Sequence, residues 1–248
     1  MLEKDDGVVL KTAKSGETSL MVTFLSRKLG KIRLMAKGAR TARSQIRGLL
    51  ESGNHIEVLY YFKEGRSVYY LKEATQLSGH FAARDSLIHM AARLAAMELL
   101  DQVCYPGSAD ENIVRLAAEY VRCGKSADPL FVFLAFELRL LEALGVLPEL
   151  SACVRCGGAL EGGYFSARNG SGICARHAEE LSGGGTDELL LLSPGILDAA
   201  VFCLENPFHL LETEEADRSV RKQLGKIIHW TYTYHVQGYS LPVSLSLI

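Results

Sequence analysis

The stretch GVVLKTAKSGETSLMVTFLSRKLGKIRLMAK, residues 7–37, alternates apolar and polar side chains in three runs with turn residues between them. Alternation with a period of two, in segments rich in Val, Ile and Thr, predicts strands at 7–13, 19–25 and 31–37. Two further runs of this kind, at 55–62 and 67–77, follow the turn signals Ser-Gly-Asn and Glu-Gly-Arg. Five short strands within about eighty residues predict a small closed sheet, for which the five-stranded OB-fold barrel is the natural candidate.

Beyond Gly79 the apolar residues recur at helical spacing instead. The pattern predicts helices at 83–103, 110–123, 129–145, 193–205 and 214–236. We expect Asp85 and Ser86 to cap the first of these, and Ser193 to cap the fourth, with Pro194 in its first turn.

A cysteine-containing segment separates the third and fourth of these helices. Cys153-x2-Cys156 is followed, after seventeen residues, by Cys174-x2-His177, which is the spacing of a structural zinc site. Four protein ligands leave no open position for a water, so one structural Zn²⁺ is favoured over a catalytic one. Two alternatives stay open: unrelated thiols beside a surface histidine, and the H-x-E element of zinc nucleobase deaminases, although here C-x-x-C precedes H-x-E.

The expected fold class is therefore α+β. We expect a five-stranded OB-fold barrel at 1–80, followed by an all-α domain at 81–248 that carries a small zinc-finger insert at 150–178.

The net charge of −2 hides an uneven distribution, because residues 1–50 carry +7 and the remainder carries −9. Residues 26–50 hold eight basic side chains and no acidic one, which indicates a surface that binds a polyanion. The strand parity at 31–37 would turn alternate cations outward. The candidate DNA-binding residues are Arg27, Lys28, Lys31, Arg33, Lys37, Arg40, Arg43 and Arg47. Exposed rings among Tyr60, Tyr61, Phe62, Tyr69 and Tyr70 could stack on unpaired bases, and alternation alone does not say which.

Other signals restrict the class of protein. The N-terminus lacks the basic and apolar regions of a secretory signal, so we expect a reducing cytoplasm and free cysteines. The most apolar run, from Leu130, is interrupted by Glu137, Arg139 and Glu142, which predicts a buried helix and no membrane partner. Neither a phosphate-binding loop nor a nucleophile elbow is present, which favours a binding protein over an enzyme.

Taken with the cysteine segment, the sequence GKIRLMAKGAR at 30–40 resembles the RecO family of bacterial DNA repair and recombination mediators, over essentially the full length. The resemblance implies an OB-fold and a helical domain with a zinc element. It implies binding to single- and double-stranded DNA without sequence preference, annealing of complementary strands, partnership with RecR and single-strand-binding protein, and help in loading RecA. It also implies a cytoplasmic, nucleoid-associated protein. His177 is a departure, since a fourth cysteine is the more usual ligand.

Two other classes compete with this interpretation: a zinc-dependent enzyme that acts on nucleic acid, and a nucleic-acid-binding regulator. For an acidic partner peptide, the candidate cations of the acidic C-terminal part are Arg139, Arg218, Arg221, Lys222 and Lys226.

Overall fold

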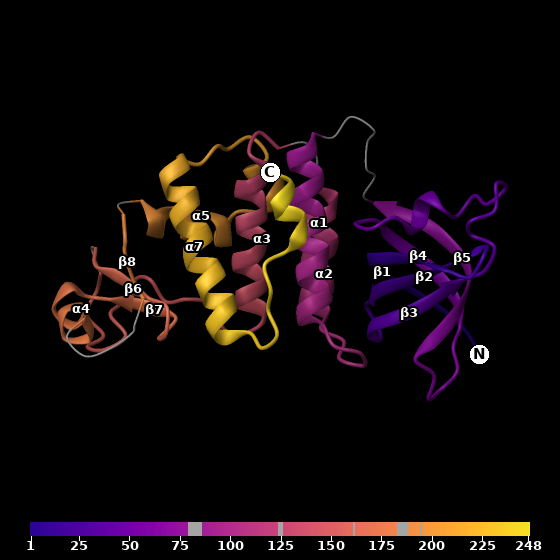
Figure 1. The fold of residues 1–248 in the computed structure, drawn as a ribbon, viewed down its shortest axis with the longest axis horizontal. Helices are drawn as coiled ribbons and strands as arrows, with labels where there is room; N and C mark the ends of the chain where they lie inside the picture. Colours follow the sequence, from indigo (N-terminus) through magenta and orange to yellow (C-terminus); the bar gives the residue numbers. More distant parts are fainter. Residues whose placement is uncertain (79–85, 124–125, 161, 183–187, 194) are drawn as a thin grey trace. The chain divides into compact units, whose positions relative to one another are not determined.

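The structure is a computed structural model that describes residues 1–78, 86–123, 126–160, 162–182, 188–193 and 195–248. The expected cap Asp85, the expected helix start at 83 and Pro194 lie outside these residues. The chain divides into two compact units, the first formed by residues 1–125 and 242–248 and the second by residues 126–241. Figure 1 labels their elements.

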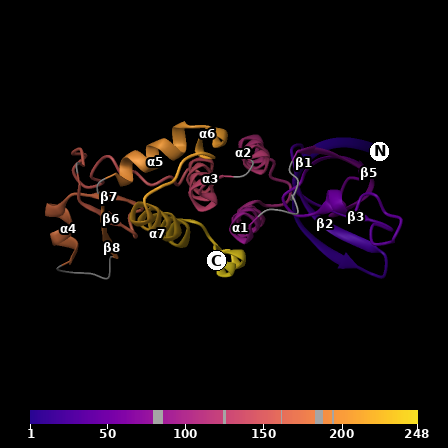
Figure 2. The same cartoon turned by 90° about the horizontal axis from the view of Figure 1, so that it is seen from above.

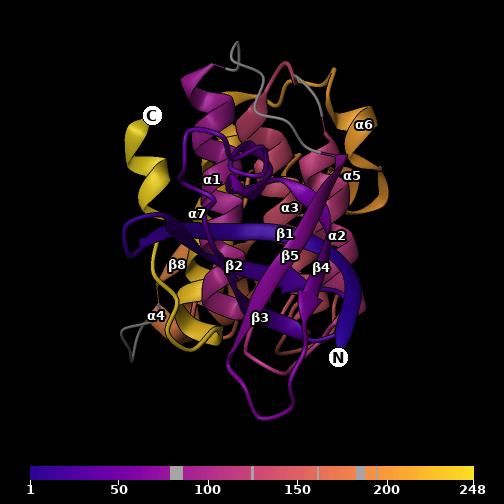
Figure 3. The ribbon, with the colours of Figure 1, turned by 90° about the vertical axis from the view of Figure 1, so that its right-hand side faces the viewer.

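The first unit begins with the predicted barrel. Its five strands are β1 (Leu2–Ser15), β2 (Ser19–Ser26), β3 (Gly30–Ala36), β4 (His55–Tyr61) and β5 (Val68–Ser78). The strands close in the order β1-β2-β3-β5-β4, and β3 pairs with β5 in parallel. Because β1 pairs with both β2 and β4, no edge is left open, and the OB-fold prediction is confirmed. Figure 3 looks onto these strands.

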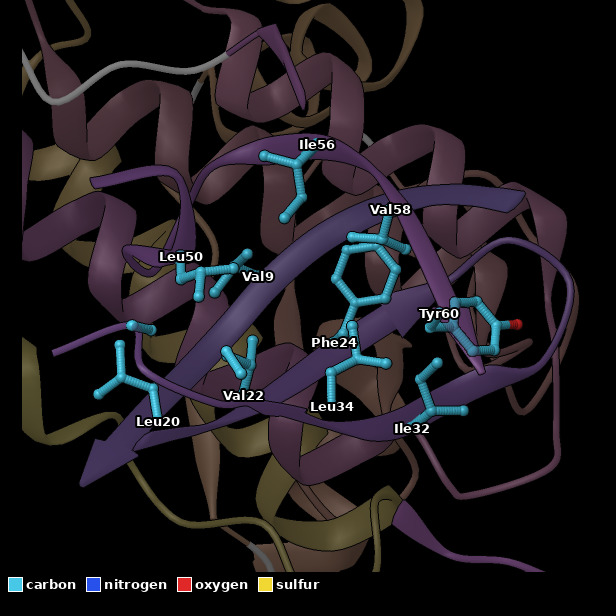
Figure 4. Packing of buried hydrophobic residues seen from close by; sticks show 12 residues of the cluster. Val9, Leu20, Val22, Phe24, Ile32, Leu34, Leu50, Ile56, Val58 and Tyr60 are labelled. Atoms are coloured by element: carbon cyan, nitrogen blue, oxygen red, sulfur yellow. The ribbon is translucent and has the colours of Figure 1, made fainter. Parts of the chain in front are cut away.

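The barrel is held together by the inward residues of every strand. Phe24, Leu34 and Tyr60 are almost completely buried in its centre, as Figure 4 shows. Leu50, from the short 3-10 helix η1 (Gly48–Leu50), packs into the same cluster. Burial of these apolar side chains is the main favourable contribution to the stability of the barrel.

A bulge in β1 shifts its register between Val9 and Lys11. Val9 belongs to the barrel core, whereas Leu10 is buried outside that core, on the strand that α1 and α2 contact. Strand β1 therefore buries side chains on both of its faces.

Two helices and the C-terminal segment complete the first unit. They are α1 (Leu87–Val103), α2 (Glu111–Arg122) and the 3-10 helix η2 (Val243–Leu247). The Ser86 hydroxyl accepts a hydrogen bond from the His89 amide, so the predicted cap of α1 is confirmed. Ser244 donates to the Glu98 carboxylate, which fastens η2 to α1.

The second unit is mainly helical. Its helices are α3 (Pro129–Ala143), α4 (Ala175–Ser182), α5 (Ile196–Glu205), α6 (Phe208–Leu211) and α7 (Arg218–His235). Helix α3 carries apolar side chains on nearly all of its faces, which is typical of a buried helix. Helices α5, α6 and α7 contact it. The expected cap Ser193 is wrong: the N-cap of α5 is Gly195, and the Ser193 hydroxyl donates to Gln223 at 2.6 Å.

A small sheet that the sequence did not predict accompanies the cysteine segment. It consists of β6 (Tyr164–Ser166), β7 (Ser171–Ile173) and β8 (Leu189–Leu191), in the order β7-β6-β8. Figure 2 shows α4 beside these strands. Three-residue strands are too short for their alternation to be recognised in the sequence. Among the described residues, no helix is long and apolar enough to span a membrane.

Candidate functional site

The cation-bearing strand β3 has the predicted parity. Ile32, Leu34 and Ala36 point into the barrel core, whereas Arg33 is exposed on the outer face. The outer face of β3 is therefore the side on which cations meet the solvent.

Three of the eight candidate cations are engaged within the first unit. Arg27 forms a 2.9 Å ion pair with Asp6 and a 3.3 Å ion pair with Glu111, and the hydrogen bond from Arg27 is the main reason that the pKa of Asp6 is lowered. Lys31 lies 3.2 Å from the Asp101 carboxylate and also donates to the Asp101 carbonyl. These contacts join the barrel to α1 and α2, so Arg27 and Lys31 have a structural role.

Lys28 is the third engaged cation. Its ammonium donates to the Lys4 carbonyl at 2.6 Å and lies 3.9 Å from the Glu3 carboxylate. Its side chain stays largely exposed, so this pairing contributes little stability.

The other five candidates have no carboxylate partner within the described part of the chain: Arg33, Lys37, Arg40, Arg43 and Arg47. The Arg40 guanidinium donates to the carbonyls of Gly16 and Glu17, both at 3.0 Å, so backbone contacts hold it against the turn between β1 and β2. The Lys37 ammonium lies 4.6 Å from the centre of the Tyr70 ring. Together these five residues form a cationic surface on β3 and on the loop that follows it.

A further cation, Lys11, was missed by sequence reasoning. It is exposed and lies in register with Thr23 on β2, which in turn pairs with Arg33 on β3. Strict alternation from Val9 would have turned Lys11 inward, and the bulge in β1 reverses that parity. Lys11 thus extends the cationic surface across three strands.

The second candidate site is the cysteine cluster. The ligand atoms of Cys153, Cys156, Cys174 and His177 all lie within 4.8 Å of one another. Nδ1 of His177 is 3.1 Å from the Cys174 sulfur and 3.6 Å from the Cys153 sulfur. Sulfurs at 2.3 Å from a tetrahedral Zn²⁺ would be about 3.8 Å apart, so the four residues fit one metal ion.

Local backbone bonds position the first pair of ligands. The Gly157 amide donates to the Cys153 carbonyl at 2.8 Å, and the Cys153 amide donates to the Gly158 carbonyl at 2.8 Å. Gly157 has a φ of +69°, which glycine adopts at no steric cost. Burial raises the pKa of the Cys153 thiol, but backbone N–H donors and His177 outweigh it and lower the pKa to about 5. This thiol is therefore prepared for the thiolate form that a metal requires.

The part of the chain that supplies these residues matches known proteins. The family described as "Recombination protein O N terminal" matches residues 1–80, and "Recombination protein O C terminal" matches residues 84–244. The chain belongs to the RecO family. A protein of Exiguobacterium sp. AT1b named "DNA repair protein RecO" is 33% identical over 183 residues, covering 73% of this chain and 72% of the relative. Another of that name, from Acetivibrio thermocellus, is 25% identical over 227 residues, covering 90% and 88%.

Membership of the RecO family identifies the chain as a DNA repair and recombination protein.

Two of the cations considered for an acidic partner peptide are already engaged. Arg139 donates to the carbonyls of Cys203 and Asn206 at the end of α5, and Arg221 pairs with Asp128. These two arginines stabilise the second unit.

Proposed function

We propose that this chain is a RecO-type mediator that binds single- and double-stranded DNA without sequence preference and anneals complementary strands. The observation that supports this proposal is the cationic surface of the barrel, with its cluster of basic side chains that no carboxylate engages in the described residues. We further propose that it acts with RecR and single-strand-binding protein to help load RecA, in the bacterial cytoplasm at the nucleoid. On this proposal the chain catalyses no reaction.

The proposed contacts are to the phosphate backbone: Lys11, Arg33, Lys37, Arg40, Arg43 and Arg47. Phosphate contacts carry no sequence information, so one surface can hold any two strands. Complementary strands repel each other, and cations that neutralise both strands raise the rate at which they meet. Arg27, Lys28 and Lys31 add less positive potential, because each of them is paired with a carboxylate.

For the cysteine cluster we propose one structural Zn²⁺ bound by Cys153, Cys156, Cys174 and His177. When bound, this ion would supply folding free energy to a segment whose buried cluster, among the described residues, consists of Cys153, Ile173 and Ala178. The H-x-E residue Glu179 is exposed to solvent on α4, and all four residues of the cluster are accounted for as ligands. The proposed Zn²⁺ therefore has a structural role.

The proposal is tested by the triple charge reversal Lys37→Glu, Arg40→Glu, Arg43→Glu. With about six phosphate contacts, the affinity of the wild-type protein for DNA should fall roughly 10³-fold between 50 and 200 mM salt. The variant should bind more weakly, and its salt slope should be smaller by about 0.9 for each phosphate that it no longer neutralises. Fluorescence anisotropy with labelled oligonucleotides of shuffled sequence measures both quantities, and strand annealing should slow in parallel.

The matched control reverses three exposed cations elsewhere: Arg115→Glu, Arg218→Glu and Lys222→Glu. It changes the net charge by the same amount and should keep the wild-type salt slope. Equal slopes for the wild type and the barrel variant would remove the cationic surface from the DNA-binding site.

A further inference from the structure

The outer face of the barrel carries an aromatic row beside the cationic surface. Alternation along β4 and β5 turns Tyr60 and Tyr69 toward the core, where their ring centres lie 5.4 Å apart. The neighbouring Tyr61 and Tyr70 point outward and keep 52% and 46% of their surface exposed. Two large aromatic rings, one on β4 and one on β5, therefore face the solvent on the outer surface of the barrel.

Strand register places these two rings side by side. Tyr61 on β4 pairs directly with Tyr70 on β5, and Tyr70 pairs in turn with Met35 on β3. Met35 pairs with Met21 on β2, so the outward row runs Tyr61, Tyr70, Met35, Met21 across four strands. Because strands in a sheet are about 4.8 Å apart, the row is a continuous strip of apolar and aromatic surface.

Positive charge flanks this strip. In the next row of the register, Lys11, Thr23, Arg33 and Val68 lie across the same sheet, and neither row contains a carboxylate. The Lys37 ammonium lies over the Tyr70 ring. An apolar protein partner would gain nothing from cations at these positions, whereas a single nucleic-acid strand presents flat bases on one side and phosphates on the other.

From this juxtaposition we infer that Tyr61 and Tyr70 form a stacking platform for the unpaired bases of a single strand, whose phosphates lie along Lys11, Arg33 and Lys37. A base that stacks on Tyr70 displaces the Lys37 ammonium from the ring toward the adjacent phosphate. Paired bases are shielded by their own stacking, so the platform serves single strands and leaves duplex binding to the cations. This inference rests on the proposed function and adds the group that distinguishes single strands from duplexes.

The test compares Tyr61→Leu, Tyr70→Leu and the double variant, as full-length protein, with the wild type. The probes are a labelled oligo(dT), an abasic oligonucleotide of equal length and a duplex. Each leucine should weaken oligo(dT) binding about 5- to 150-fold, which corresponds to the loss of one base–aromatic stack. Abasic and duplex affinities, and the salt slope on every probe, should stay at the wild-type values, which also shows that the variants are folded.

Two control variants test whether the effect requires an aromatic ring at this place. Tyr70→Phe keeps the ring and should bind oligo(dT) like the wild type. Tyr105→Leu removes a tyrosine of the same unit that is 59% exposed but lies outside the row, and it should change nothing.

Equal losses of affinity for oligo(dT) and for the abasic probe, or no loss for either, would overturn the platform. Wild-type duplex binding in either case would leave the cationic surface as a DNA-binding site, so the proposed function would stand. A full-length protein that binds none of the three probes would overturn both proposals together.

Discussion

At the scale of the single residue, Glu137 is a carboxyl that the second unit buries. It lies on α3 with only 5% of its surface exposed, and burial raises the pKa of its carboxyl from 4.5 to about 8. The side chain is therefore neutral in the folded protein at neutral pH, whereas it is ionised in the unfolded chain. Between pH 4.5 and 8 the folded state holds the extra proton, so stability must fall as the pH rises through this window.

The first prediction concerns Glu137→Gln, which replaces the carboxyl with an amide of the same shape. Glu137→Gln cannot ionise, so the stability that the wild type loses toward pH 9 should be retained in the variant. The difference should be several kcal/mol at pH 9, since one pKa unit corresponds to about 1.4 kcal/mol, and should shrink at pH 5. Urea unfolding at both pH values, followed by circular dichroism, measures it.

Glu142→Gln provides the control on the same helix, because Glu142 is exposed. Its unfolding free energy should follow the wild type at both pH values. A Glu137→Gln variant that tracks the wild type from pH 5 to 9 would show that water reaches this carboxyl.

At the scale of the element, the cysteine segment is attached to the helices of its unit by aromatic contacts. Phe165 of β6 stacks on Trp230 of α7, with ring centres 6.4 Å apart. The Lys226 ammonium lies 4.3 Å from the centre of the Trp230 ring. A side chain at Gly170 would meet the His235 ring, so this turn also packs closely against the end of α7. A loss of order in the cysteine segment should therefore change the surroundings of Trp230, the single tryptophan in the sequence.

The next prediction uses this tryptophan as a reporter of metal removal. A chelator, or the change Cys174→Ser, should lower the melting temperature and shift the emission of Trp230 to longer wavelength as the Phe165 packing loosens. Added Zn²⁺ should reverse the effect of the chelator, with one ion bound per chain. DNA affinity measured on protein that is still folded should change little, because the proposed phosphate contacts lie on the barrel.

Cys123→Ser is the corresponding control, since Cys123 lies at the end of α2, outside the cluster. It should keep one bound metal ion and the wild-type emission. Loss of DNA binding at once on chelation, with melting temperature and emission unchanged, would contradict a structural role.

Sequence patterns predicted the elements better than their contacts. The alternation in 7–37 was sufficient for three barrel strands, and the apolar spacing of 129–145 for α3, because these patterns repeat over many residues. The pairing of Arg27 with Glu111 and of Lys31 with Asp101 could not be predicted, because the partners are 84 and 70 residues apart. The position of Lys11 depends on a bulge, which leaves no reliable mark in the sequence.

At the scale of the whole molecule, the compact unit that contains the barrel is larger than the barrel itself. The unit that contains the barrel also includes α1, α2 and the last seven residues. Gly30, with a φ of +68°, is where β3 meets the segment between α1 and α2, and it forms a bridge with Pro106. A Cβ at Gly30 would lie 2.3 Å from the Ser108 carbonyl oxygen.

The final prediction follows from this close approach. Gly30→Ala must move the segment at Ser108 as well as strain the backbone, so it should lower the melting temperature markedly. Gly16→Ala is the matched control, since Gly16 has a φ of +65° with no atom within 4 Å of the added carbon. It should cost only the backbone strain, about 1–2 kcal/mol. Equal melting temperatures for the two variants would show that β3 does not depend on its approach to Ser108.

The contacts of β1 and β3 with α1 and α2 have a consequence for work with fragments. A polypeptide that stops at residue 80 would lack Asp101 and Glu111, and it would uncover Leu10, whose surface is now only 3% exposed. Such a truncated barrel would leave Lys31 without its carboxylate partner, although Arg27 would keep Asp6, and it would expose an apolar flank. Its attraction to nucleic acid would overstate that of the parent molecule, and its tendency to aggregate would be an artefact of the cut.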